Sequence, residues 1–554
     1  MAYVITQRCC NDASCVTECP VDCIRPRPED PEFATAEMLH IDPGTCIDCG
    51  ACVEACPVDA IHADEELPDV LARYAEINAA WFEHHPLDTA IAPVDMPRRL
   101  SRESGPLRVA IVGTGPAACY AAENLIGRGN VEIEMFDRLP APWGLARYGV
   151  APDHAETRGV TDMFASAFKR DAVRFHLNVE VGRDISHAEL LTHCHAVIYA
   201  VGASADRRLG VPGEDLPGCV PATEFVAWYN GHPDFADHTF DFSGERAVIV
   251  GNGNVALDVA RVLTADPDRL TATTDIAGHA IEALRHSNIR EVVLLGRRPL
   301  ANASFSGPEF LALGHLPDTD IVVDPADIDD EVRAALDDPG TDPALRLKLR
   351  LATEYARRDT GDRKRIVFRF LTSPAAVSGA DRVTGLDCVR NEMTPGPNGL
   401  VPVPTADVEP LDTSLVLRAI GYRGRAVADL PFDEARGVIP HEHGRVIDAA
   451  GTPTPGAYVS GWIKRGPRGV IGSNRRDAEE TVTALVDDFT TGRLGAPAQD
   501  REALAALLSE RCPGLVDRDG WTAIDAAEKA NGARAGRPRE KFTRVADLIA
   551  AARA

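Results

Sequence analysis

Four cysteines near the start of the chain have the spacing of an iron-sulfur site. Nine of the 14 cysteines fall within the first 56 residues, where Cys46, Cys49, Cys52 and Cys56 form the run C-x-x-C-x-x-C-x-x-x-C-P. Soft thiolates on a tight loop, two residues apart, can turn toward different irons of a cubic cluster. The spacing therefore predicts an electron carrier at the front of the molecule.

A second, altered run precedes the first. It has aspartate where the second cysteine is expected. In paired runs of this type the fourth cysteine binds the neighbouring cluster. The altered site then suits either a four-iron cube with a carboxylate ligand or a three-iron cluster, and spacing does not place Cys10 or Cys23. We therefore predict two ligand groups: a complete set (Cys19, Cys46, Cys49 and Cys52) and an altered set (Cys9, Cys15 and Cys56, with or without Asp12).

Two other uses of cysteine fit the sequence less well. Disulfides need an oxidising compartment, and the N-terminus MAYVITQRCC has no basic region followed by an apolar stretch that would direct export. A structural zinc site would pair two C-x-x-C units across a longer gap. Iron and sulfide are therefore the expected occupants.

Length and charge exclude several classes of protein. A chain of 554 residues with 45% hydrophobic and 26% charged residues is expected to form three or four globular domains. The net charge of -26 argues against nucleic acid as a partner. Because no run of 18 apolar residues occurs, we expect no membrane span and a cytoplasmic location. Residues 1–100 hold 19 acidic and 6 basic side chains, either a docking face for a basic redox partner or a solvated surface.

The pattern of the sequence changes after the cysteine-rich region. An amphipathic segment, residues 67–82, is expected to cover the small cysteine-rich core. Residues 86–106 contain prolines and polar residues without periodicity and are expected to form a linker. From Leu107 onward strands and helices alternate, which predicts a parallel sheet covered on both faces.

A first phosphate-binding turn follows at once. The strand Val109 to Val112 leads into Gly113-x-Gly115-x-x-Ala118 and then a helix. The glycines allow a tight turn and the close approach of a pyrophosphate to the helix N-terminus. The next strand ends at Asp137, whose carboxylate can accept a hydrogen bond from a ribose hydroxyl. These features predict a dinucleotide site.

A second turn, Gly251-x-Gly253-x-x-Ala256, has the same context. Its next strand ends in Arg297 and Arg298 instead of an acid. Guanidinium groups pair with a ribose phosphate that a carboxylate would repel, so NADP is preferred to NAD, although arginines at a strand exit are often merely solvated. The long spacing predicts an additional helical stretch at residues 264–287.

These motifs together resemble a known family. With the two glycine turns, the segments PAPWGLARYGVAPDH (140–154) and GWIKRGPRGVIGSNRRDA (461–478) resemble the adrenodoxin-reductase-like ferredoxin–NADP reductases from residue 107 to the C-terminus. Residues 1–85 resemble the bacterial two-cluster ferredoxins of the seven-iron type through AYVITQRC and CPVDCI. The resemblance implies an α+β ferredoxin domain fused to an α/β flavoprotein with two Rossmann-like dinucleotide-binding domains.

The implied domains follow in order along the chain. They are an iron-sulfur ferredoxin domain (1–85), the linker (86–106), the first part of an FAD-binding domain (107–204), an NADP-binding domain (205–412), the second part of the FAD-binding domain (413–494) and a helical C-terminal extension (495–554).

The resemblance also implies roles for single residues. It assigns to FAD the positions Gly113, Gly115, Ala117, Ala118, Asp137, Leu145, Val181, Trp462, Gly469, Val470 and Ile471. It assigns to NADPH the positions Gly251, Gly253, Asn254, Val255, Arg297 and Arg298. His154 matches a histidine near the flavin and Glu309 an acid near the nicotinamide, which makes both catalytic candidates. Their ordinary alternatives are a loop histidine and a carboxylate at a helix start.

The implied activity is that of an NADPH:ferredoxin oxidoreductase. NADPH would pass a hydride to FAD, which would feed single electrons to the two fused clusters and on to an external acceptor protein of ferredoxin or cytochrome type. One alternative is an electron-feeding subunit of a larger complex, similar to the small subunit of glutamate synthase; another is a non-catalytic wiring subunit. The two intact glycine turns and the segment GVAPDH favour the reductase.

Overall fold

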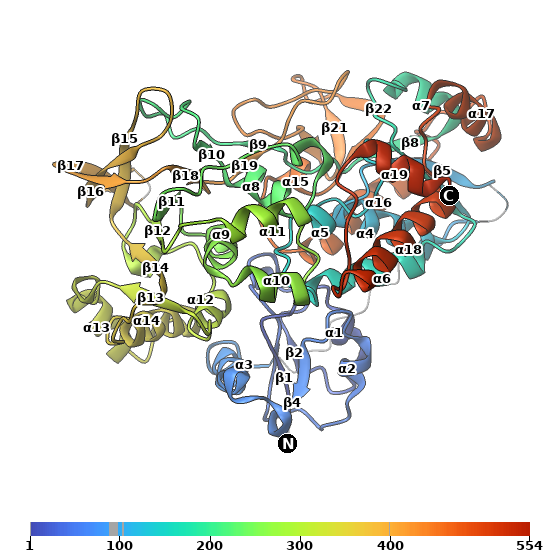
Figure 1. Cartoon of the computed structure of the whole chain (residues 1–554). Coiled ribbons are helices and arrows are strands. Elements are labelled where there is room, and N and C mark those ends of the chain that lie inside the picture. Colours follow the sequence, from blue (N-terminus) through green and yellow to red (C-terminus); the bar gives the residue numbers. More distant parts are fainter. Residues whose placement is uncertain (1, 88–97, 102, 104, 398) are drawn as a thin grey trace.

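The computed structural model describes residues 2–87, 98–101, 103, 105–397 and 399–554. A small N-terminal module lies beneath two larger parts, each built on its own sheet, that stand side by side (Figure 1). The predicted linker, residues 86–106, falls largely outside the described residues.

The N-terminal module (residues 2–87) is built from two short ribbons and three helices. β1 (Tyr3–Ile5) pairs antiparallel with β4 (Ile61–Ala63), and β2 (Ile24–Arg25) pairs antiparallel with β3 (His40–Ile41). The first two helices, α1 (Ser14–Glu18) and α2 (Ala51–Ala55), end at Cys19 and Cys56. Each cysteine has extended backbone and precedes a proline, which cannot continue a helix.

The third helix of the module, α3 (Arg73–His84), overlaps the predicted segment 67–82. Its buried Asn78 side chain accepts hydrogen bonds from the amides of Ile5 (3.2 Å) and Ile41 (2.9 Å) and donates one to the Ile5 carbonyl (2.8 Å). One amide group thus joins both ribbons to the helix that covers them.

The first large sheet has seven strands in the order β20-β21-β22-β8-β5-β6-β7. The five strands from β22 to β7 are parallel, as their buried Val, Ile and Ala residues predict for a sheet covered on both faces. Its strands are β5 (Leu107–Val112), β6 (Val131–Asp137), β7 (Val173–Leu177), β8 (Ala196–Tyr199), β20 (His441–Glu442), β21 (Arg445–Ile447) and β22 (Pro453–Val459). Its helices are α4 (Pro116–Arg128), α5 (Leu145–Tyr148), α6 (Val160–Ala167), α7 (His187–His193), α15 (Trp462–Arg465) and α16 (Ser473–Thr490).

The second large sheet has six strands, all parallel, in the order β10-β18-β11-β12-β14-β13. Its strands are β10 (Cys219–Pro221), β11 (Arg246–Val250), β12 (Glu291–Leu295), β13 (Thr319–Val323), β14 (Lys364–Arg369) and β18 (Leu415–Arg418). Its helices are α8 (Ala222–Tyr229), α9 (Asn254–Thr264), α10 (Pro267–Thr273), α11 (Gly278–Arg285), α12 (Gly307–Leu313), α13 (Asp330–Asp337) and α14 (Pro343–Tyr355).

Two features of this second part bear on the predictions. Helices α10 and α11 occupy the additional helical stretch expected at 264–287. Strand β18 pairs within this sheet although it follows residue 412, so the predicted domain boundary at 412/413 cuts the sheet and lies too early. The reason is topological: the antiparallel β15 (Thr372–Ser378), β16 (Gly385–Gly396) and β17 (Gly399–Asp412) leave the sheet, and the chain then returns to it.

The two large parts are joined by a ribbon, and the C-terminal helices cover the first of them. The crossover segments β9 (Ala205–Asp206) and β19 (Tyr422–Arg423) pair antiparallel. The helices α17 (Arg501–Arg511), α18 (Arg518–Arg534) and α19 (Val545–Ala552) cover the first sheet (Figure 1). The fully buried Glu528 of α18 accepts hydrogen bonds from Arg147 (2.6 Å) and Arg539 (2.8 Å) and so fixes this extension to α5.

The N-terminal module is docked against both large parts. Arg73 of α3 makes an ion pair with Glu354 of α14, in which Nη2 of Arg73 donates to both carboxylate oxygens (2.8 and 3.0 Å). Arg8 pairs with Glu156 of the first part at 3.1 Å. Within the described residues, no helix is long and apolar enough to cross a membrane.

Candidate redox site

The complete cysteine set lines one cavity. A small, partly open pocket is bounded by Cys19, Cys46, Cys49 and Cys52, together with Cys23, Tyr3 and several apolar side chains. Cys19 comes from the end of α1 and the others from the loop and helix around α2, so the fold brings the two runs together as cross-ligation requires. A thiolate cage of this kind fits an iron-sulfur cluster.

The cysteines of the altered set do not line this pocket. The backbone N–H groups of Leu39 and Ala60 point at the sulfurs of Cys9 (3.5 Å) and Cys56 (3.3 Å), the kind of donor that stabilises a cluster thiolate. Asp12 is buried and its carboxylate accepts a hydrogen bond from the Ser14 hydroxyl. Asp12 as a metal ligand therefore remains a prediction.

The first glycine turn has the shape that a pyrophosphate needs. Gly113 has φ +105°, and a Cβ there would lie 2.5 Å from the Ala200 carbonyl oxygen. Gly115 is the N-cap of α4, and a Cβ added to it meets only Gly144, at 3.9 Å, so its outer side is open. Ala118 is fully buried against the sheet. The N-terminus of α4 is thus exposed to a ligand phosphate.

The Asp137 carboxylate makes hydrogen bonds within the protein that the sequence does not predict. One carboxylate oxygen accepts hydrogen bonds from the Thr114 amide (3.1 Å) and hydroxyl (2.5 Å), and the other accepts one from the Leu139 amide (3.0 Å). The second oxygen retains a lone pair for a ribose hydroxyl. Asp137 therefore both closes the turn and can contact a nucleotide.

The other positions assigned to FAD gather around this turn. Gly144, which precedes the half-exposed Leu145, packs on Gly115, and Gly461, which precedes Trp462, packs on Ala117 of α4. The Trp462 indole donates a hydrogen bond to the Arg468 carbonyl (3.2 Å), and its ring lies 5.4 Å from that of Tyr422. Val181 packs against the apolar cluster that includes Val112 of β5 and Phe136 of β6. The segment Gly469, Val470 and Ile471 leads into α16, where the Val470 amide donates to Ser473 (3.1 Å).

The second turn has the same local geometry. Gly251 has φ +120°, Gly253 is the N-cap of α9, and a Cβ on Gly253 would meet only Ser304, at 3.9 Å. The Asn254 side chain accepts a hydrogen bond from the Ser306 amide (2.8 Å), and Val255 lies in the first turn of α9. Arg297 and Arg298 follow the carboxyl end of β12, the neighbour of β11, and are exposed. No ion pair engages either guanidinium within the described part of the chain.

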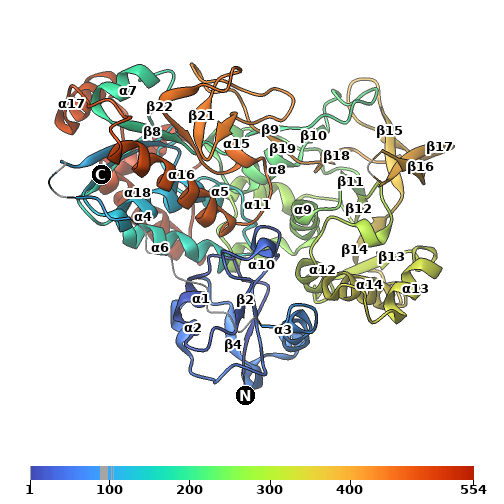
Figure 2. The same ribbon diagram turned by 180° about the vertical axis from the view of Figure 1, so that it is seen from behind.

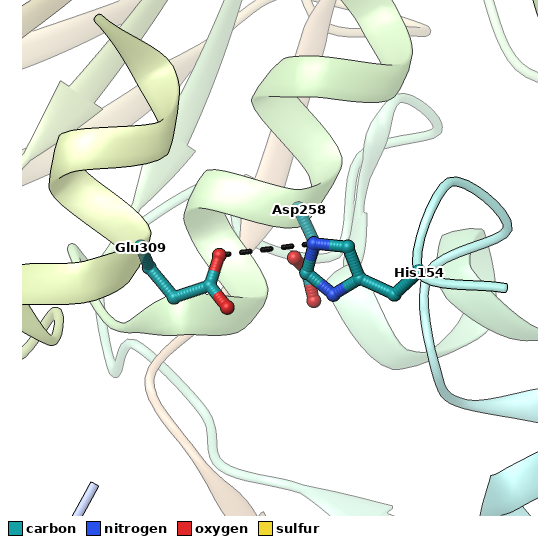
Figure 3. A group of neighbouring side chains, drawn as sticks. All are labelled: His154, Asp258 and Glu309. Carbon is teal, nitrogen blue, oxygen red and sulfur yellow. Dashed lines mark ion pairs between the residues drawn. The ribbon is translucent and has the colours of Figure 1, made fainter. Parts of the chain in front are cut away.

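His154 and Glu309 meet between the two large parts. His154 comes from the loop after α5, Glu309 from α12, and their closest N and O atoms lie 3.9 Å apart beside Asp258 of α9 (Figure 3). Arg261 of α9, only 4% exposed, is the hub of this group. Its guanidinium donates to His154 Nε2 (2.8 Å), Asp258 (2.8 Å), Asp153 (2.8 Å) and Glu309 (3.1 Å).

This hub sets the charge state of the histidine. An arginine can only donate, so His154 Nε2 must accept, and the ring proton then sits on Nδ1. Burial and the positive charge of Arg261 both lower the pKa of His154. Burial raises the pKa of Glu309, and Arg261 opposes that rise. A neutral imidazole thus faces a carboxyl group that holds a proton more readily than an exposed glutamate does.

The same geometry argues against a metal at this position. His154, Asp258 and Glu309 are close enough to share an ion. Because the guanidinium of Arg261 already bonds all three, a divalent cation would meet a fixed positive charge. The group is therefore an ion-pair network that joins the two sheets.

Sequence reasoning missed the residues that connect the parts. Arg261 lies in a largely apolar helix, α9. The only sequence feature that could have indicated its role is a charged residue on the face of the helix expected to be buried. Gly472 directly follows the segment assigned to the flavin; its amide donates to the Cys10 carbonyl (2.7 Å), and a Cβ on it would lie 1.8 Å from the Asn11 carbonyl oxygen. Nothing in the local sequence indicates that contact.

Comparison with known proteins agrees with this geometry. Residues 39–62 match the family described as 4Fe-4S binding domain, and residues 107–273 match the family described as pyridine nucleotide-disulphide oxidoreductase. The chain is 48% identical, over its whole length and 95% of the relative, to a probable ferredoxin/ferredoxin–NADP reductase of Mycobacterium tuberculosis. It is 39% identical over 82% of its length to the mitochondrial NADPH:adrenodoxin oxidoreductase of Arabidopsis thaliana, of which it covers 96%.

A solved structure supports the assignment of the two large sheets. The structure of M. tuberculosis FprA in complex with NADPH matches 81% of this chain and all of its own, with a TM-score of 0.77 and 41% identity. The expected fold, a ferredoxin-like module fused to an FprA-like oxidoreductase, is confirmed. The chain therefore belongs to the ferredoxin/ferredoxin–NADP reductase family of FAD-dependent oxidoreductases.

Proposed function

We propose that this chain oxidises NADPH and delivers its electrons one at a time, through two iron-sulfur clusters of its own, to an external acceptor protein. One observation carries the proposal: the N-terminal module is docked directly beside the segment assigned to the flavin, because the amide of Gly472, the next residue, donates a hydrogen bond to the Cys10 carbonyl (2.7 Å). The module therefore needs no diffusive docking step to receive electrons.

The cofactors and the protein divide the work. Bound FAD supplies the conversion between a hydride and single electrons, and thiolate-bound iron-sulfur clusters carry single electrons. The chain's own residues hold these groups in line. The open N-terminus of α4 binds the FAD pyrophosphate, Asp137 orients its ribose, and the Trp462 and Gly469–Ile471 segments enclose the rest.

The second sheet brings the reductant. The N-terminus of α9 binds the NADPH pyrophosphate, and the free guanidinium groups of Arg297 and Arg298 pair with the additional phosphate. Arg261 fixes His154 and Glu309 at the junction of the two sheets. We assign to His154 and Glu309 the orientation of the nicotinamide against the flavin.

An anaerobic titration tests the proposal. The purified chain is titrated with NADPH and, separately, with NADH, while flavin absorbance and cluster EPR signals are followed together. We expect NADPH to bleach the flavin and reduce clusters in the same sample, and NADH to do so only at much higher concentration. A protein that carries zinc in place of iron and sulfide, or that does not retain flavin, contradicts the proposal.

A further inference from the structure

The two cysteine sets occupy different environments. Two cysteines of the altered set, Cys9 and Cys56, lie on the face of the module turned to the first sheet. Cys10, Val58 and Ala60 are buried in the same apolar core as the first sheet, and Cys9 and Cys56 pack against that core. This core also contacts Ile471, the last residue of the segment assigned to the flavin.

Polar contacts fix the altered set in place. The Arg475 guanidinium of α16 donates to the Asp12 carbonyl (2.7 Å) and reaches the Ser14 hydroxyl at 3.4 Å. With the Gly472–Cys10 hydrogen bond, backbone groups on both sides of Asn11 are held by the start of α16. Since Gly472 has no room for a Cβ, the backbone at the start of α16 is in close contact with the backbone at Asn11.

The complete set opens to solvent instead. Cys49 is exposed, and Ile47 beside it has 59% of its surface accessible, a large value for an isoleucine. The N-terminus, β4 and α2 of the module point away from the two sheets, whereas α1 lies nearer to them (Figure 2). The complete set is therefore the outer one.

From this arrangement we propose an order of electron flow: electrons enter the module at the altered set and leave it at the complete set, beside Ile47 and Cys49. The inference rests on the proposed function. Each NADPH gives up two electrons and becomes NADP⁺ with release of one proton. The two electrons cross the altered and complete sets singly, so two molecules of a one-electron acceptor are reduced for each NADPH oxidised. Asp12, which stands in place of a cysteine, thus belongs to the set that electrons reach first.

Charge indicates what kind of acceptor fits the outer face. Two of the six basic side chains in residues 1–100, Arg8 and Arg73, are turned inward to Glu156 and Glu354. Asp48, between Ile47 and Cys49, is exposed, and no ion pair involves it in the described part of the chain. An exposed apolar side chain, Ile47, thus lies next to the exposed carboxylate of Asp48, and this pair fits an acceptor protein with a positive face.

Two variants of the full holoprotein test the order of flow. Cys49→Ala removes a ligand of the complete set. Under anaerobic NADPH, freeze-quench EPR is expected to show the altered-set signal at the wild-type rate, while reduction of cytochrome c falls at least about tenfold. An altered set that stays oxidised although it holds iron would mean that electrons enter through the complete set, and the proposed order would be wrong.

Gly472→Ala provides the second test and does not touch a ligand. Its new methyl group would displace Asn11, so both cluster signals should lag behind flavin bleaching by about tenfold or more while iron content stays normal. Unchanged cluster kinetics would overturn the inner position of the altered set. Flavin bleaching by NADPH is recorded in the wild type throughout: its absence would contradict the proposed function, whereas bleaching with the wrong cluster order contradicts only this inference.

The acceptor face is tested by charge reversal. Asp48→Lys should raise the KM for cytochrome c, a basic acceptor, by about 3- to 10-fold at low salt, and high salt should reduce the difference. Glu83→Lys, an equal charge change at an exposed position of α3, is the matched control and should leave that KM unchanged. Equal effects of both variants would show that net charge, and not this face, guides the acceptor.

Discussion

Nucleotide selectivity offers the sharpest test of the second sheet. Arg297 and Arg298 are exposed at the carboxyl end of β12, beside the Gly251 turn, and their guanidinium groups are free to bind a phosphate. A hydrogen bond to a charged group contributes roughly 1.5 to 3 kcal/mol, and solvent exposure favours the lower end of that range. At about 1.36 kcal/mol per factor of ten, each lost contact should reduce kcat/KM for NADPH about tenfold.

The assay compares two nucleotides in one variant. The double substitution Arg297→Ala with Arg298→Ala should lower kcat/KM for NADPH by about a hundredfold if the contacts are independent, and leave NADH largely unchanged. Arg290→Ala is the control, because Arg290 is also exposed but lies at the opposite end of β12. Equal losses with NADPH and NADH would refute the reasoning, since the arginines would then support the fold or the whole nucleotide instead of reading its phosphate.

Three further predictions follow from buried charges and from the altered set. Arg261→Met leaves three carboxylates without their shared cation and should destabilise the junction by about 3–5 kcal/mol, seen as a lower temperature of flavin release; an unchanged temperature would contradict the hub role. Asp12→Cys should favour a four-iron cube, and unchanged EPR spectra would place Asp12 away from the metal. Burial lowers the pKa of His40 from 6.5 to about 3. Below pH 6.5 the unfolded chain binds a proton at His40 that the folded chain does not bind, so the module should lose about 2 kcal/mol of stability between pH 8 and 5. This loss is measured by cluster bleaching in urea, and His40→Phe should remove it.

The parts of the fold that the sequence predicts are those encoded by local patterns. Glycine turns such as Gly113 to Ala118 specify a strand, a tight turn and a helix within a few residues, and the spacing of the cysteine runs specifies an iron-sulfur module. The predicted dinucleotide folds and ferredoxin module are confirmed for that reason. The roles of single residues in these turns remain predictions.

What the sequence could not predict depends on contacts between distant segments. The boundary at 412 failed because β18 returns to its sheet after a long antiparallel excursion, which no local signal announces. Arg261 contacts His154, more than a hundred residues earlier in the chain, and its burial is explained only by the network that it completes. Such contacts depend on how the folded chain packs. In the sequence, the only sign of this one is a charged residue within an otherwise apolar helix.

The docking of the module changes how its acidic composition should be understood. From sequence, the excess negative charge suited either a face for a redox partner or a solvated surface. In the fold, Arg8 and Arg73 face inward and pair with Glu156 and Glu354 of the reductase part, so these two basic side chains do not offset the negative charge of the outward face. The ion pairs with Glu156 and Glu354 and the outward charge of Asp48 should therefore affect different steps: the first pairs affect electron entry into the module, and Asp48 affects binding of the acceptor. Arg73→Ala should slow cluster reduction at constant acceptor KM, whereas Asp48→Lys should raise the acceptor KM at constant cluster reduction.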